Sequence, residues 1–152
     1  MMVNDNDLPT GGRFDGQQHR FPVRVYFEDT DLSGIVYHAN YLRYMERARS
    51  DMLRLAAIDQ RAAFEAGEGA YAVRTMELEY IAPARLDDAL VVASRLIRVR
   101  AAAVDIHHTV MRGDDTLVRA GVQVAFVAPS GRPRRQPSSW LDAFEPLIWK
   151  GN

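Results

Sequence analysis

The chain has 152 residues and a formal net charge of −1; 47% of its residues are hydrophobic, 26% are charged and none is cysteine. This composition is typical of a single soluble globular domain, and the lack of cysteine excludes disulfides, thiol catalysis and zinc–thiolate sites. The near-neutral charge gives no overall field for nucleic acid or an anionic membrane, and no uncharged stretch is long enough to span a membrane. We therefore expect a cytoplasmic protein that binds no nucleic acid.

The first segment with a regular pattern is a strand. Residues 1–20 are polar and Gly-rich without periodicity, which predicts a flexible leader that lacks the apolar core of a signal peptide. Residues 21–29, FPVRVYFED, alternate between apolar and polar side chains, as a half-buried strand does.

The most regular segment is a helix that we expect to begin near Asn40, a residue type that often caps helices. Arg47 and Asp51 lie on its polar side and are spaced for an i,i+4 ion pair, so we expect both to face solvent. Glu46 falls between the polar and apolar stripes, where an ion pair with a neighbouring arginine is the simpler explanation. The apolar stripe follows the 3.6-residue repeat through Tyr41, Tyr44, Met45, Ala48, Met52 and Leu55.

The remaining chain is rich in strand patterns. Apolar and polar residues alternate, or β-branched residues cluster, in four segments, at 76–80, 90–99, 104–110 and 118–126. The sequences between them resemble turns, which suggests antiparallel strands with hairpin-like links. One strand, one long helix and four strands define an α+β domain over 21–128, in which a curled antiparallel sheet of about five strands wraps the helix.

Two further expectations follow from this architecture. The face and edges of such a sheet need covering, and self-association is the usual way to cover them. In the tail, 129–152, Ser138 or Ser139 is suited to cap a short last helix that contains Trp140, Phe144 and Leu147.

Asp31 lies in DLSGIVYHAN, directly before the predicted helix. Asp, Ser and Gly are standard turn residues, so one interpretation is a plain connecting loop. The other interpretation is functional, because a helix N-terminus favours an ionised carboxylate by about 0.3–1 kcal/mol. The same helix end offers backbone N–H groups, from about Gly34 to Asn40, that can hold an oxyanion. A carboxylate beside such N–H groups is the smallest set of groups that can catalyse acyl transfer. The pattern alone leaves both interpretations open.

The histidines also have two interpretations. His38 is either an exposed residue of the first helical turn or a group that handles protons or polarises a carbonyl. His107 and His108 are adjacent in a predicted strand and point to opposite faces, so they cannot chelate one metal together. We expect no metal and no cofactor.

The segment VRVYFEDTDLSGIVYHANYLRYMERARSDMLR (23–54) resembles the signature of the 4-hydroxybenzoyl-CoA thioesterase family. It is most similar to the YbgC branch, acyl-CoA thioesterases associated with the Tol-Pal system of bacterial envelopes, as is YAVRTMELEYIAPARLDDAL (71–90). The likeness covers about residues 20–128. One departure is the sequence DLSG, which stands where many close relatives have Asp-Ala-Gly-Gly and makes the loop bulkier beside the acid.

This resemblance implies a hot-dog fold and hydrolysis of an acyl-CoA to a free acid and CoA. It assigns Asp31 as nucleophile or general base and His38 as a second catalytic residue whose backbone N–H polarises the thioester carbonyl. Gly34, Tyr37 and Asn40 are then expected to contact substrate. The resemblance also implies a homodimer or homotetramer with sites at subunit interfaces, and partners of the Tol-Pal system or of phospholipid metabolism. The alternative is a non-catalytic hot-dog protein that binds acyl-CoA or serves in envelope assembly.

Overall fold

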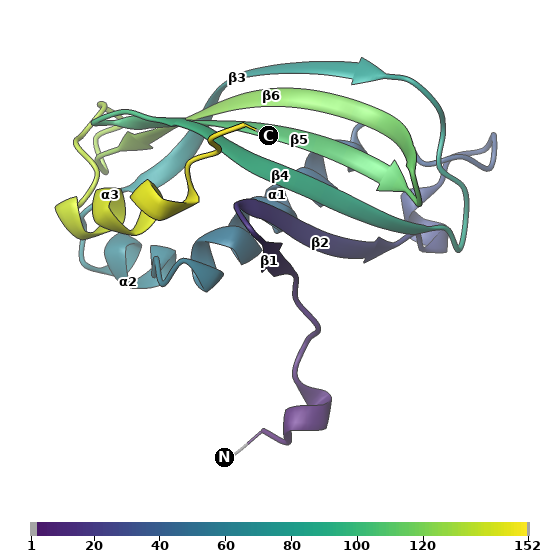
Figure 1. The fold of residues 1–152 in the computed structure, drawn as a ribbon, viewed down its shortest axis with the longest axis horizontal. Coiled ribbons are helices and arrows are strands. Elements are labelled where there is room, and N and C mark those ends of the chain that lie inside the picture. The colour runs from purple at the N-terminus through teal and green to yellow at the C-terminus, as the bar shows by residue number, and fades with distance from the viewer. Residues whose placement is uncertain (1–2, 152) are drawn as a thin grey trace.

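Residues 3–151 are described by the computed structural model, and they form one curved sheet with a long helix against one face (Figure 1). The described residues include three short 3-10 helices, which are η1 (Asp5–Asp7), η2 (Phe27–Asp29) and η3 (Glu145–Leu147). The helices are α1 (Asn40–Leu55), α2 (Gln60–Glu65) and α3 (Ser138–Phe144). The strands are β1 (Arg13–Asp15), β2 (Gln18–Arg24), β3 (Ala70–Tyr80), β4 (Ala89–Val99), β5 (Ala103–Arg112) and β6 (Asp115–Val127).

The predicted α+β class is confirmed, with one more strand than expected. Within the described residues, six strands pair antiparallel in the order β1-β2-β4-β5-β6-β3. The links from β4 to β5 and from β5 to β6 are hairpins. The link from β3 to β4 is not a hairpin, because β3 pairs with β6 at the far edge of the sheet. The sequence pattern could not show this, since pairing partners far apart in the chain leave no local signal.

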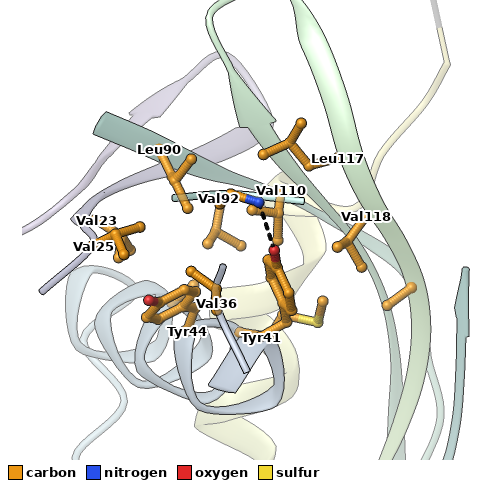
Figure 2. Close-up of a cluster of buried hydrophobic side chains, with 14 residues drawn as sticks. Val23, Val25, Val36, Tyr41, Tyr44, Leu90, Val92, Val110, Leu117 and Val118 are labelled. Carbon is orange, nitrogen blue, oxygen red and sulfur yellow. Dashed lines mark hydrogen bonds between the residues drawn. The ribbon is translucent and has the colours of Figure 1, made fainter. Parts of the chain in front are cut away.

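The apolar stripe of α1 packs against the concave face of the sheet, except for Leu55, which is exposed. Around its first two turns lie Val23, Val25 and Val92, with Tyr41 and Tyr44 pointing from the helix toward them (Figure 2). A second cluster surrounds the last turns of α1 and includes residues of all three helices and of the strands β4, β5 and β6: Met52, Leu53, Ile58, Ala63, Leu96, Val104, Ile106, Val122, Val124, Phe126, Trp140 and Phe144. Each large side chain buried in this way contributes about 1.5–3 kcal/mol, which explains how two clusters fix the helix along its whole length.

The strand expected over 21–29 begins earlier and ends earlier than predicted. β2 starts at Gln18 and stops at Arg24, and the chain then turns through η2. The Asp29 carboxylate accepts a hydrogen bond from the Tyr26 backbone N–H at 2.9 Å, which closes this turn and diverts the backbone from the sheet. An acidic side chain that accepts a hydrogen bond from a nearby backbone N–H stabilises a turn in place of a strand. The alternating pattern of 21–29 did not reveal this hydrogen bond.

The polar side of α1 is covered near its middle, contrary to expectation. Asp51 is buried and pairs with the buried His19 of β2, with 2.7 Å between Oδ2 and Nε2. The same oxygen accepts the Gly12 backbone N–H at 2.9 Å. A Cβ at Gly12 would lie 2.3 Å from the Arg20 carbonyl oxygen, so only glycine permits this close approach. The predicted Arg47–Asp51 pair is therefore wrong, and residues 12–20 are tied to the helix.

The ends of the helices also differ from expectation. Ala39, without a side-chain hydrogen bond, occupies the N-cap position of α1, and Asn40 is its first residue. α3 begins at Ser138 with Pro137 before it, and its Trp140 and Phe144 side chains are buried. Across residues 3–151, no helix is long and apolar enough to cross a membrane.

Candidate active site

The loop between η2 and α1 is a tight turn centred on Asp31. The Asp31 N–H donates to the Ile35 carbonyl at 2.9 Å, and the Gly34 N–H donates to the Asp31 carbonyl at 3.1 Å. Gly34 has a φ of +81°, a left-handed value that glycine adopts without strain. The turn is attached to the body by the Val36 N–H, which donates to the Ala84 carbonyl at 2.9 Å. Gly34 thus shapes the turn that presents the acid.

The Asp31 carboxylate is exposed and held from one side by its own loop. Its Oδ1 accepts hydrogen bonds from the Ser33 hydroxyl and, at 2.8 Å, from the Ser33 backbone N–H. These two bonds from Ser33, with a smaller contribution from the charge of His38, hold the pKa of Asp31 below its ordinary value. The carboxylate is therefore ionised at neutral pH, and no hydrogen bond to Oδ2 is found within residues 3–151.

Fewer backbone N–H groups are available before α1 than the sequence suggested. Four of these N–H groups donate to backbone carbonyls of the protein, namely those of Gly34, Val36, Tyr37 and Asn40. Across residues 3–151, no hydrogen bond is found for the N–H groups of Ile35, His38 and Ala39, of which those at positions 38 and 39 directly precede α1. These two N–H groups lie at the positive end of the α1 dipole, where they suit an anionic or polarised oxygen.

His38 is exposed and lies among aromatic rings. Its ring centroid is 4.5 Å from that of Tyr37 and 6.3 Å from that of Tyr80, the last residue of β3. The Tyr80 hydroxyl donates to the His38 carbonyl at 2.9 Å. Among the described residues, His38 forms no ion pair with Asp31. The structure therefore brings the two predicted catalytic residues to the same loop without joining them directly.

A mostly apolar crevice of about 320 Å³ opens beside His38. Tyr41 and Tyr80 line it, and the Tyr41 hydroxyl accepts the Ala84 N–H at 3.0 Å. Burial raises the pKa of both tyrosines, which keeps their hydroxyls protonated at physiological pH. A crevice with a histidine and two neutral phenols at its wall can accept an apolar group near Asp31.

Of the three residues expected to contact substrate, two have structural partners. Asn40 is buried, and its Nδ2 donates to the Asp29 carbonyl at 2.8 Å, which holds the loop against the helix. Gly34 forms the turn, and Tyr37 is exposed beside His38. Tyr80 was not among the residues expected at the site. The segment 71–90, which resembles the family, contains Tyr80 and was the signal that could have indicated it.

A sheet that curls around one long helix, with a carboxylate turn at the helix N-terminus, defines a hot-dog protein of the thioesterase type. Residues 25–145 match the family model described as the thioesterase-like superfamily. The chain belongs to this superfamily, and it is a thioester hydrolase.

Individual relatives agree with the family match. The chain is 41% identical over 128 residues to the "Acyl-CoA thioester hydrolase YbgC" of Escherichia coli O6:H1, covering 83% of this chain and 95% of that protein. It is 42% identical over 107 residues to the "Acyl-CoA thioesterase YbgC" of Haemophilus influenzae, covering 70% of this chain and 79% of that protein. The crystal structure of a probable thioesterase from Bartonella henselae superposes with a TM-score of 0.75 at 36% identity, covering 79% of this chain and 99% of that one.

Proposed function

We propose that the protein hydrolyses acyl-CoA thioesters to a free acid and CoA, with Asp31 as the reacting carboxylate. The observation that carries the proposal is the arrangement at the start of α1. In the part of the chain that the structure describes, an ionised carboxylate with an unbonded Oδ2 stands in the same loop as the N–H groups of positions 38 and 39, which have no acceptor there. The names of the YbgC relatives support the choice of acyl-CoA as substrate.

Two routes use these groups. In the first, Asp31 Oδ2 attacks the thioester carbonyl carbon, the C–S bond breaks, and the CoA thiolate leaves and takes a proton. Water then hydrolyses the mixed anhydride and restores the carboxylate. In the second, Asp31 takes a proton from a water molecule while the water oxygen attacks the carbonyl carbon. The C–S bond then breaks, and the CoA thiolate leaves and takes that proton. In both, the N–H groups of positions 38 and 39 stabilise the negative charge that develops on the carbonyl oxygen.

His38 is assigned to proton handling at the same centre. Its exposed imidazole stands beside the crevice and can both accept and donate a proton. A group of this kind can give a proton to the leaving thiolate or orient the attacking water. Tyr80 fixes the His38 backbone through the bond to its carbonyl, and so positions the N–H that follows.

The proposal includes a dimer, on the evidence of the sheet edges. Among the described strands, β3 pairs only with β6, so the N–H and C=O groups that face away from β6 along this 11-residue strand have no strand partner. The opposite edge belongs to β1, which has three residues. A long edge with exposed Val73 and Tyr80 needs a partner strand, and a second copy of the chain supplies one. Tyr80 lies at this edge and donates to the His38 carbonyl, so the site would then lie beside the subunit interface.

Asp31→Asn is the direct test, with thiol release measured on acyl-CoA substrates of different chain length. The amide keeps the volume and can still accept the Ser33 hydrogen bonds, so the loop stays folded while the negative charge is lost. Turnover should fall by about 10²–10⁴-fold. A folded Asp31→Asn protein with near-wild-type turnover would refute the assignment.

The same assay addresses the alternative of a binding protein without turnover. That alternative predicts that wild type binds acyl-CoA but releases no thiol. In the single chain Asp31 is exposed, so no cost of burying the carboxylate argues against a binding role. The cytoplasmic location, expected from the sequence pattern, and the Tol-Pal or phospholipid-metabolism partners, implied by the resemblance, stay predictions.

A further inference from the structure

The turn that presents Asp31 has two arms, which pair with each other. Residues 29–31 form the first arm, which carries the acid, and residues 35–37 form the second arm. Backbone contacts pair the arms at three positions: Asp29 with Tyr37, Thr30 with Val36, and Asp31 with Ile35. The turn is therefore a short antiparallel ladder, and its second arm leads into the start of α1.

The two arms differ in how they are attached to the rest of the protein. The second arm is held by the Val36 N–H, which donates to the Ala84 carbonyl at 2.9 Å. For the first arm, a single attachment is found within residues 3–151, because the Asn40 Nδ2 donates to the Asp29 carbonyl at 2.8 Å. The other hydrogen bonds found for the first arm stay within 26–37. The position of the acid relative to α1 therefore depends on one side chain.

Asn40 is well placed to hold the first arm, because it is the first residue of α1 and is only 8% exposed. The Asp29 carbonyl accepts two N–H groups, one from the Tyr37 backbone at 2.9 Å and one from the Asn40 side chain. A carbonyl oxygen has two lone pairs, so the two donors do not compete. One bond closes the ladder, and the other joins the ladder to the helix.

The N–H groups that the proposed function uses lie on the helix side of this junction, at positions 38 and 39. The Asn40 N–H donates to the Tyr37 carbonyl at 2.8 Å, so the backbone between these two residues is closed into a turn. The acid lies on the other side, on the first arm. A movement of the first arm against α1 would therefore carry the carboxylate away from these N–H groups without unfolding the helix. A displacement of about 1 Å between reacting groups can cost about 10²-fold in rate.

We propose that Asn40 is a positioning residue for thioester hydrolysis. By holding the Asp29 carbonyl, its side chain fixes the distance between the Asp31 carboxylate and the N–H groups of positions 38 and 39. Asn40 then acts through the loop and does not touch the substrate, in contrast to the contact that the resemblance implies. This inference rests on the proposed function and adds a residue on which the reaction depends.

Two variants remove the donor in different ways, and their turnover is measured on the acyl-CoA that wild type hydrolyses fastest. Asn40→Ala removes the side chain without adding a charge. Asn40→Asp keeps the shape, but its carboxylate cannot donate a hydrogen bond. A negative charge in the first turn of a helix is favourable, so α1 stays folded in this variant.

Both variants should lower kcat by about 10–10²-fold and leave KM within about twofold of wild type, because the lost alignment matters in the transition state. A raised KM with an unchanged kcat would indicate a substrate contact and overturn the proposal. Wild-type kinetics in both variants would overturn it as well.

Hydrogen exchange of single backbone N–H groups, followed by NMR, examines the same contact without any substrate. In Asn40→Ala the Tyr37 N–H should exchange at least about fivefold faster than in wild type, because the arm that carries its acceptor is loosened. The Val36 N–H donates to Ala84 and should exchange as in wild type. An unchanged rate at Tyr37 would overturn the proposal. An equal increase at Val36 would show general loosening of the loop and would also overturn it.

Asp51→Ala is the control that separates positioning from stability. Asp51 lies about three turns along α1 from Asn40 and accepts its hydrogen bonds from His19 and Gly12, so its loss destabilises the chain at another place. At a temperature where it is folded, Asp51→Ala should have wild-type kcat and KM. A fall in its kcat equal to that of Asn40→Ala would assign the effect to general destabilisation and overturn the proposal.

Failure of this inference and failure of the proposed function give different results. If wild type releases no thiol from any acyl-CoA, the proposed function fails, and the inference that rests on it fails too. If wild type is active, Asp31→Asn is inactive and both Asn40 variants keep wild-type kinetics, the proposed function stands and only the role of Asn40 is overturned.

Discussion

Replacing Asp51 by alanine tests how strongly residues 12–20 are fastened to α1. The substitution removes the acceptor of two hydrogen bonds, from His19 Nε2 at 2.7 Å and from the Gly12 N–H at 2.9 Å. Burial lowers the pKa of His19, so the ring is neutral and donates through Nε2. Its Nδ1 already lacks a partner among the described residues, and the variant would leave the buried ring with no hydrogen bond at all.

The expected loss follows from the burial of the two partners. A hydrogen bond to a charged group contributes about 1.5–3 kcal/mol, and water can replace part of the loss at the less buried Gly12. We expect Asp51→Ala to lower the free energy of unfolding by about 3 kcal/mol. For a chain of this size that corresponds to a fall of about 6–12 °C in melting temperature.

Urea and thermal unfolding measure this loss, with Glu65→Ala as the control. Glu65 pairs with Arg61 at 3.0 Å, but both side chains are exposed, and such pairs contribute less than about 1 kcal/mol. The control should therefore lie close to wild type. A loss below about 1 kcal/mol in Asp51→Ala would refute the inference that the hairpin of β1 and β2 is anchored through this carboxylate.

Three other predictions concern the site and the assembly. Ser33→Ala removes the hydroxyl that is the main cause of the lowered pKa of Asp31, so that pKa should rise toward its ordinary value. If turnover needs ionised Asp31, its acid limb should then move to higher pH than in wild type, and an unshifted limb would show that Ser33 does not tune the acid. His38→Ala keeps the backbone N–H, so a fall in turnover approaching that of Asp31→Asn, with a changed pH profile, would identify the imidazole as the acting group. Matching pH profiles and rates would leave His38 as a backbone donor only. Light scattering should give at least a dimer in solution, and a monodisperse active monomer would contradict pairing through β3.

Elements with a local repeat were predictable because periodicity is a property of neighbouring residues. The stripe of α1 and the alternation in β3 to β6 each occur within one segment, and burying the apolar face is the dominant local demand. The Asp31 turn was also visible, because an acid followed three residues later by a glycine is a local signal. The predicted start of the helix near Asn40 also placed His38 directly before the helix.

Tertiary structure decided what the polar residues do. Asp51 has the sequence context of a solvent-facing residue, yet His19, 32 positions away, makes it a buried acceptor. Arg49 is buried for the same kind of reason, because His108 of β5, 59 positions away, lies against its guanidinium. A polar side chain can be buried only where a distant segment supplies its hydrogen bonds, and a local pattern carries no record of that segment. The sequence alone therefore determined the helix, the main strands and the position of the acid, whereas chain packing decided which backbone amides stay free and which charges are buried.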